Sequence, residues 1–160
     1  MYKLPAMAAV IIAASLMGIV MSGELKKRID TLKEIVQSAL YIKTDLEYRA
    51  PNLEECFTRR GCMFNSAGKF MSQSGMTPFE AVKRACEEER YLTKEDKDTI
   101  LIFAENLNCE EISGQVANIK WLVENLRKNI RNAEDEYRSK GKLYQLGGMF
   151  AGVGIVIILL

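Results

Sequence analysis

Residues 116–137 read VANIKWLVENLRKNIRNAEDEY, and this stretch constrains the fold more than any other. Its apolar side chains recur at alternating intervals of three and four residues, which is the spacing of one face of an α-helix. The members of this apolar seam are Val116, Ile119, Val123, Leu126, Ile130, Ala133 and Tyr137. Three heptads are short for a two-chain coiled coil. We therefore favour packing of the seam within one chain, with a dimeric coiled coil as the alternative.

A second amphipathic helix is predicted nearer the start of the chain. Its apolar stripe consists of Leu25, Ile29, Leu32, Val36, Ala39 and Leu46. The pair Ala50–Pro51 ends this helix, because the residue before a proline is disfavoured in the α conformation. The two predicted helices, 24–48 and 113–140, would extend about 37–42 Å each. We expect them to form an antiparallel pair.

Shorter helices are predicted between these two. Helix-start patterns occur at Asn52–Glu55, Thr77–Glu80 and Thr93–Asp96, where a capping side chain is followed three residues later by an acidic one. The last of these leads into a stripe made of Ile100, Phe103, Ala104 and Leu107. The segment 64–74 is a weaker helix candidate because it contains Gly68. Because no segment alternates as a strand does, the prediction is an all-α bundle.

Two runs without any charged residue lie outside this bundle. Leu4–Ser22 has nineteen residues and Leu143–Leu160 has eighteen. A helix of eighteen residues rises roughly 27 Å, close to the hydrocarbon thickness of a bilayer. We predict transmembrane helices at 4–22 and 143–160 that flank a helical domain at 23–142. The alternative for the first run is a cleaved signal peptide, although its apolar stretch is long for one.

Basic residues cluster on the domain side of both runs. They are Lys26, Lys27 and Arg28 after the first run, and Arg138, Lys140 and Lys142 before the second. Only Lys3 lies on the far side of either run. Since short cytoplasmic flanks carry the excess of Lys and Arg, the domain is expected to face the cytoplasm. The same residues would lie at the level of anionic lipid head groups.

The composition argues against several kinds of chemistry. The chain has no histidine, which removes the commonest general base and metal ligand. Cys56, Cys62, Cys86 and Cys109 lack metal-ligand spacing, so we expect reduced, packed cysteines and no metal or cofactor.

All 21 acidic residues and every basic residue except Lys3 fall at 23–142, which makes this region neutral and disfavours nucleic acid as a partner. Runs of adjacent glutamates at 87–89 and 110–111 are typical of a solvated face, and no enzymatic activity is expected.

Small residues give the predicted spans a face for helix packing. Gly148 and Gly152 are four residues apart in the second span, and Ala14 and Gly18 have the same spacing in the first. Such pairs allow transmembrane helices to approach closely. We predict that these residues pack against other membrane helices, and self-association of the chain is a further expectation.

Over essentially its full length the chain resembles the stage III sporulation protein AB family. The resemblance rests on the order and spacing of weak motifs flanked by the two apolar runs. These motifs are Leu32–Glu34, Asp45–Tyr48, Thr77–Ala81, Leu92–Asp96, Phe103, Leu107, Gln115 and the apolar end 146–160. The chain departs from the family pattern at Asn108, where glycine is usual, and at Val82, where an aromatic residue is common.

The resemblance implies a component of the channel apparatus between mother cell and forespore in an endospore-forming bacterium. Members of the family resemble the cytoplasmic helical domain of type II secretion and type IV pilus platform proteins. The implied role is a non-enzymatic platform that recruits or couples to a secretion-type ATPase and other channel subunits. The implied location is the outer forespore membrane, with the domain in the mother-cell cytoplasm. A membrane-anchored signalling or lipid-sensing module is the alternative that the basic clusters favour.

Overall fold

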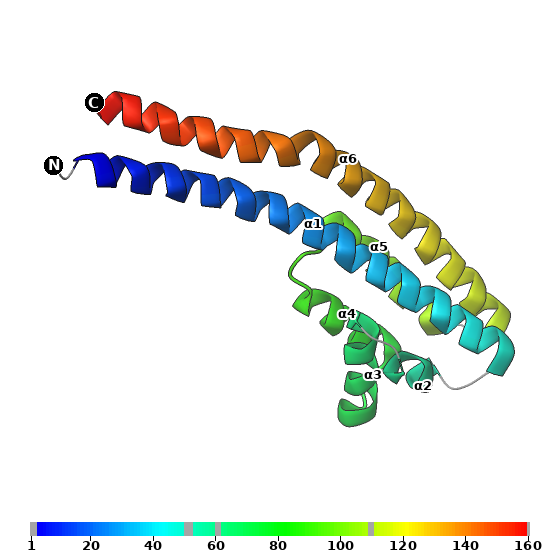
Figure 1. Ribbon diagram of the computed structural model, residues 1–160. Helices are drawn as coiled ribbons and strands as arrows, with labels where there is room; N and C mark the ends of the chain where they lie inside the picture. The colour runs from blue at the N-terminus through cyan, green and yellow to red at the C-terminus, as the bar shows by residue number, and fades with distance from the viewer. Residues whose placement is uncertain (1–2, 50–52, 60–61, 109–110, 160) are drawn as a thin grey trace. The chain divides into compact units, whose positions relative to one another are not determined.

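The computed structural model describes residues 3–49, 53–59, 62–108 and 111–159, and describes side chains at 20, 22–48, 53–59, 63–107 and 111–140. Every element in these residues is helical, which confirms the all-α prediction (Figure 1). The elements are α1 (Lys3–Arg49), α2 (Leu53–Thr58), α3 (Cys62–Ser74), α4 (Pro78–Glu88), α5 (Lys94–Glu105), the 3₁₀ turn η1 (Asn106–Asn108) and α6 (Ile112–Leu159).

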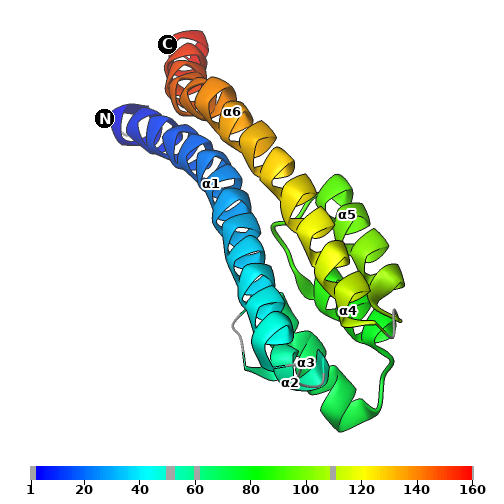
Figure 2. The same ribbon diagram turned by 90° about the vertical axis from the view of Figure 1, so that its right-hand side faces the viewer.

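The chain divides into two compact units. Unit 2 is Asp30–Arg131, and unit 1 combines Met1–Ile29 with Asn132–Leu160. In unit 2 the second half of α1 and the first half of α6 lie side by side and run antiparallel (Figures 1 and 2). The four helices α2 to α5 complete this unit. The antiparallel pair therefore forms part of a larger bundle.

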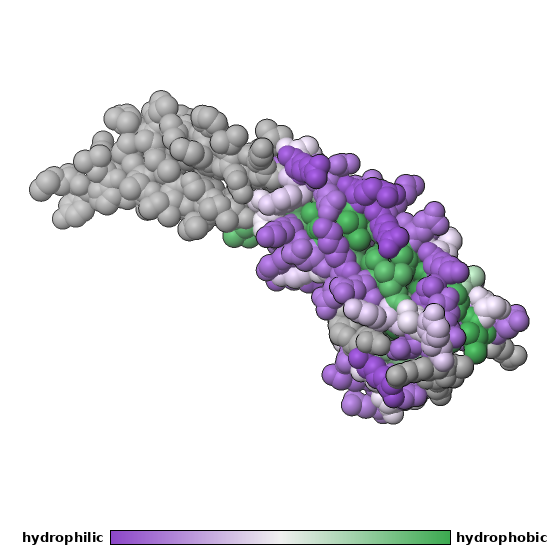
Figure 3. Space-filling view, turned by 45° about the vertical axis from the view of Figure 1, so that its right-hand side comes forward, coloured by the Kyte–Doolittle hydropathy of each residue, from purple (hydrophilic) through white to green (hydrophobic). Residues whose placement is uncertain are grey.

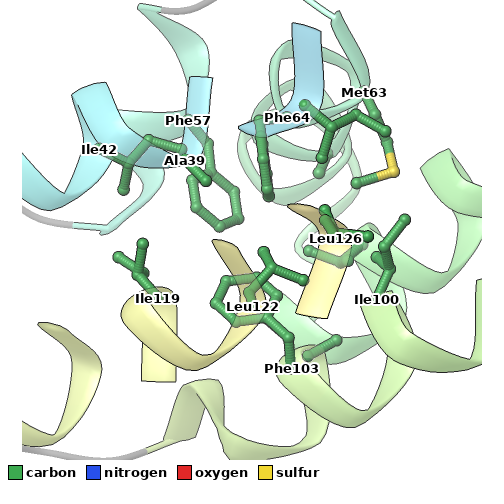
Figure 4. Packing of buried hydrophobic residues seen from close by; sticks show 14 of the residues in the cluster. Ala39, Ile42, Phe57, Met63, Phe64, Ile100, Phe103, Ile119, Leu122 and Leu126 are labelled. Atoms are coloured by element: carbon green, nitrogen blue, oxygen red, sulfur yellow. The ribbon is translucent and has the colours of Figure 1, made fainter. Parts of the chain in front are cut away.

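One hydrophobic core joins all six helices of unit 2. The predicted α6 seam is buried from Val116 to Ala133, and the α1 stripe is buried from Ile29 to Leu46. Figure 4 shows core side chains of α1, α2, α3, α5 and α6 pointing toward one another. Leu122, which lies beside the seam, is also fully buried. This broader buried face is typical of a bundle and wider than a coiled-coil seam.

Aromatic rings occupy the centre of the core. The rings of Phe57 and Phe64 have centroids 5.1 Å apart, and the ring of Phe103 meets Phe64 edge-on at 6.2 Å. These three residues come from α2, α3 and α5 and are at most 1% exposed. Each such ring pair contributes about 0.5–1.5 kcal/mol beyond its buried area. The aromatic cluster thus ties the short helices to one another.

Two of the predicted helix starts form complete capping boxes. In α4 the Thr77 hydroxyl accepts from the Glu80 amide, while the Glu80 carboxylate accepts from the Thr77 amide at 3.0 Å. In α5 Thr93 and Asp96 make the same reciprocal pair. The third predicted start includes Asn52, which lies outside the described residues. Glu80 is fully exposed, and its hydrogen bonds with Thr77 lower the pKa of its carboxyl.

Gly68 lies within α3, so the weak helix predicted there is in fact regular. A Cβ at this position would come within 2.7 Å of both the backbone nitrogen and Cγ2 of Thr58. Because α2 ends so close to α3, a side chain at residue 68 would force the two helices apart. The glycine that weakens the sequence signal is therefore required by packing. Gly75 ends the helix with a left-handed φ of 61°, as the predicted break requires.

Unit 1 contains the remaining parts of α1 and α6. The guanidinium of Arg28 pairs with the carboxylate of Glu136 at 3.4 Å, and the Arg28 side chain is only 11% exposed. Ser22, Ile29 and Ala133 are buried in the same unit. The start of α1 and the end of α6 lie at one end of it (Figure 1).

The predicted transmembrane spans fall almost entirely outside the residues with described side chains. α1 covers 4–22 and α6 covers all of 143–160 except the last residue. Among the described residues, no helix is long and apolar enough to cross a membrane.

Candidate interaction surfaces

A buried polar link fixes α5 against α6. Asp96, which is 0% exposed, accepts hydrogen bonds from the Thr93 amide at 3.0 Å and from the Thr93 hydroxyl at 2.7 Å. Its other carboxylate oxygen accepts from the side-chain amide of Asn129 on α6 at 3.0 Å. The side chain of Asn118, also on α6, donates to the carbonyl of Phe103 at 2.9 Å. These contacts set which face of α5 points inward, and therefore which face is left outside.

A groove opens between α1 and α6 in unit 2. Its volume is about 440 Å³, and it is lined by Leu40, Lys43, Lys120, Val123, Glu124, Arg127 and Arg131. The lining contains four cations and one carboxylate, so the groove has a positive field. Two apolar side chains lie among them: Leu40 is 36% exposed and Val123 is 5% exposed. The groove thus offers both charge and a small apolar contact.

The α6 cations of the groove are not neutralised by the chain's own carboxylates. Within the part of the chain with described side chains, Lys120, Arg127 and Arg131 make no ion pair. Lys43 of α1 differs, because it pairs with Glu47 at 2.9 Å. Figure 3 shows hydrophobic surface gathered in a band with hydrophilic side chains on both sides. The groove is therefore a candidate for binding an acidic partner surface.

The basic residues predicted at the membrane surface differ from one another in exposure and in their ion pairs. Lys26, Lys27, Arg138 and Lys140 are exposed, and Lys140 pairs with Glu136 at 2.7 Å. Arg28 is instead buried against Glu136, so its charge is used within unit 1. The side chain of Lys142 lies outside the described residues, as do those of Ala14, Gly18, Gly148 and Gly152. The predicted packing face of the spans stays a prediction.

The acidic runs and cysteines form no metal site among the described residues. Glu87 and Glu88 are exposed, whereas Glu89 is partly buried. Burial raises the pKa of the Glu89 carboxyl, and the nearby charge of Glu34 raises it further. Cys56 and Cys86 are buried free thiols, while Cys109 and the side chain of Cys62 lie outside the described residues.

Sequence reasoning missed the groove, although its α6 cations recur on one helical face.

Cys86 is expected to react very slowly with thiol reagents. Burial raises the pKa of its thiol from 9.0 to about 11. Because the thiolate is the reactive form, its fraction at pH 8 falls about a hundredfold relative to an unshifted thiol. Timed alkylation of the folded and the denatured chain, read out by mass spectrometry, measures this. Equal labelling rates at Cys86 in the two states would contradict the buried position.

The raised pKa also sets a pH dependence for stability. The folded state holds the Cys86 proton more tightly than the unfolded state does, so its contribution is complete below the unfolded pKa of 9.0. That contribution is lost as the pH rises toward about 11. Stability should therefore decline over this window, and a Cys86→Ala variant should show a smaller decline.

The described residues form an all-helical chain in which parts of the long helices α1 and α6 and the helices α2 to α5 make one bundle. A family model for stage III sporulation protein AB matches residues 3–160. The chain therefore belongs to the stage III sporulation protein AB family, which gives it a role in stage III of sporulation. No match was found among curated proteins or among solved structures.

Proposed function

We propose that this protein is a non-enzymatic membrane platform of the channel apparatus between mother cell and forespore. The family match over residues 3–160 carries the proposal, because it covers both the bundle and the two apolar ends. In this role unit 2 binds partner proteins, and the apolar helix ends hold it in the outer forespore membrane. The partners are a secretion-type ATPase and other channel subunits.

The physical features of the chain support a binding role. Unit 2 has a continuous hydrophobic core and capped helices, so it can present a rigid surface. Its groove carries cations that the described part of the chain does not pair, which suits recognition of an acidic protein surface. The basic residues Lys26, Lys27 and Arg138 suit a location at the cytoplasmic face of a membrane.

A lipid-sensing or signalling module is the second candidate. The observation that favours it is that Lys26, Lys27, Arg138 and Lys140 are all exposed and all belong to unit 1. Juxtamembrane cations of this kind attract anionic lipid by about 1 kcal/mol per residue. Under this alternative, binding to anionic vesicles would change with lipid composition, and no ATPase would accompany the protein.

Co-purification from sporulating cells tests the platform role. The affinity-tagged full chain, extracted in mild detergent, should recover the secretion-type ATPase and the channel subunits. Replacing both Gly148 and Gly152 by isoleucine keeps the span apolar but blocks close helix approach. We expect this variant to insert into the membrane, recover fewer channel subunits and sporulate poorly.

The matched control places bulk elsewhere on the same helix. A variant with Val153→Leu and Ile157→Leu, at positions on the opposite side of the helix from Gly148 and Gly152, should behave as the unaltered chain does. Normal sporulation and recovery of subunits by the double isoleucine variant would show that the span is only an anchor. Absence of the ATPase from the material recovered with the unaltered chain would contradict the platform proposal itself.

A further inference from the structure

The outward face of α5 is an acidic stripe. Its members are Glu95, Asp98, Ile102 and Glu105, which follow one another at intervals of three, four and three residues. All four are exposed, and Ile102 is 46% exposed. Within the part of the chain with described side chains, none of the three carboxylates makes an ion pair. The stripe therefore combines three carboxylates that make no ion pair with one apolar side chain, and the exposed Lys94 lies beside it on the same face of α5.

The α6 edge of the groove has the opposite pattern. It presents Lys120, Arg127 and Arg131 at intervals of seven and four residues. The α5 stripe extends about 15 Å along its helix, and this edge extends about 17 Å. Each contains three charges of one sign, and the exposed apolar side chain of the groove is Leu40 on α1, because Val123 is 5% exposed and packs in the core. The two surfaces therefore match in length and charge.

We infer that the groove receives α5 of a second copy of this chain, with the two helices antiparallel. In that register each of the three α6 cations meets a carboxylate. The opposing pairs are Glu105 with Lys120, Asp98 with Arg127, and Glu95 with Arg131.

The two surfaces cannot satisfy each other within one chain. Asn129, which binds α5 through Asp96, is nine residues from Lys120. At 100° per residue these two positions lie on opposite faces of α6. α5 is therefore held on one face of α6 while the groove cations project from the other. Pairing of the stripe with the groove requires another copy.

A second copy fits the groove better than a lipid surface or a nucleic acid does. Leu40, which is 36% exposed, supplies an apolar contact that phosphates would not use. The region 23–142 has no net charge, whereas nucleic-acid binders carry a basic excess. A helix with one apolar side chain among carboxylates suits the three α6 cations and Leu40, although Glu124 opposes it.

Docking of this kind joins two different surfaces, so it is heterologous. Each bound copy still presents its own free stripe or groove, and repetition gives a ring or an open array. Exposed ion pairs contribute little individually and weaken as salt increases. Association should therefore be salt-sensitive and strongest where copies are concentrated in a membrane. The inference does not depend on an ATPase partner.

Cysteine cross-linking of the full chain in membranes tests the docking register. In a Cys62→Ser, Cys109→Ser background, Glu105→Cys and Lys120→Cys together should give dimers and higher multimers on mild oxidation. Either cysteine alone should leave the chain monomeric. Multimers from the pair should decrease about tenfold with Arg127→Glu, because a repulsion replaces an attraction.

Charge exchange separates this docking from other uses of the groove. Adding Asp98→Lys to Arg127→Glu should restore cross-linking, since the pair is then reversed. Lys128→Glu makes the same charge change on α6 outside the groove and should have no effect. Failure to form multimers would overturn the inference. A loss of cross-linking with Arg127→Glu that Asp98→Lys does not restore would also overturn the inference. That result would indicate that a foreign acidic protein or an anionic vesicle occupies the groove.

Discussion

Replacing Leu126 by aspartate is expected to unfold unit 2. Leu126 is 0% exposed and lies in the hydrophobic core of the bundle. Removing a large aliphatic side chain costs about 2–5 kcal/mol, and burying a carboxylate without a partner adds to this cost. The total is comparable to the whole stability of a typical domain, about 5–15 kcal/mol. Thermal unfolding of the full chain in detergent, followed by circular dichroism, measures the loss.

Ile112 provides the control for this substitution. It lies on the same helix and is 43% exposed, so Ile112→Asp changes the same chemistry without burying a charge. We expect Ile112→Asp to melt as the unaltered chain does. Unchanged melting of Leu126→Asp would mean that the α6 seam faces solvent or a partner.

Replacing Asp96 by alanine is expected to give the second largest loss. The change removes half of a capping box, which costs about 1 kcal/mol. It also leaves the buried Asn129 amide without its acceptor, and an unsatisfied buried donor costs about 1–3 kcal/mol. Chemical denaturation of the full chain should therefore show a loss of about 2–4 kcal/mol.

Two comparisons make this result specific. Asp98→Ala, two residues away on the exposed face, should leave the free energy of unfolding nearly unchanged. A double-mutant cycle of Asp96→Ala with Asn129→Ala should give a coupling of about 0.5–3 kcal/mol, as expected for direct contacts. A coupling of zero would mean that the Asp96–Asn129 hydrogen bond does not hold α5 on α6.

Periodicity predicted which helices exist and most of their inner faces. It missed Ile35, Ile42 and Leu122, which are buried beside the predicted stripes. The predicted stripes describe only the face on which the two long helices meet each other, and this face is narrow. In the bundle α2 to α5 also pack against them, so each long helix buries a wider face. The width of a helix's buried face depends on how many other helices pack against it. The sequence of that helix alone does not reveal this number.

Contacts between distant residues were beyond sequence reasoning for a similar reason. Asp96 was recognised as part of a helix start, but its bond to Asn129 spans 33 residues. Arg28 was assigned to lipid head groups, whereas its carboxylate partner lies 108 residues away. In both cases the residue type predicts that a partner is needed, and only the fold determines which one is present.

The groove illustrates the same relation at the surface. Lys120, Arg127 and Arg131 fall on one face of α6 in the sequence, where they resemble an ordinary solvated stripe. Only the packing of α1 beside α6 makes them one wall of a groove. The acidic stripe of α5 likewise becomes informative once its buried face is known. A search for complementary stripes on different helices would have found this pair.

Membrane topology tests the central claim most directly, because a platform must hold unit 2 on the cytoplasmic side. The basic residues on the domain side of both apolar runs predict that the two termini lie across the membrane. Alkaline phosphatase fused after Leu160 should therefore be active, and green fluorescent protein fused at the same position should be dark. A fluorescent C-terminal fusion together with an inactive phosphatase fusion would contradict the proposed platform.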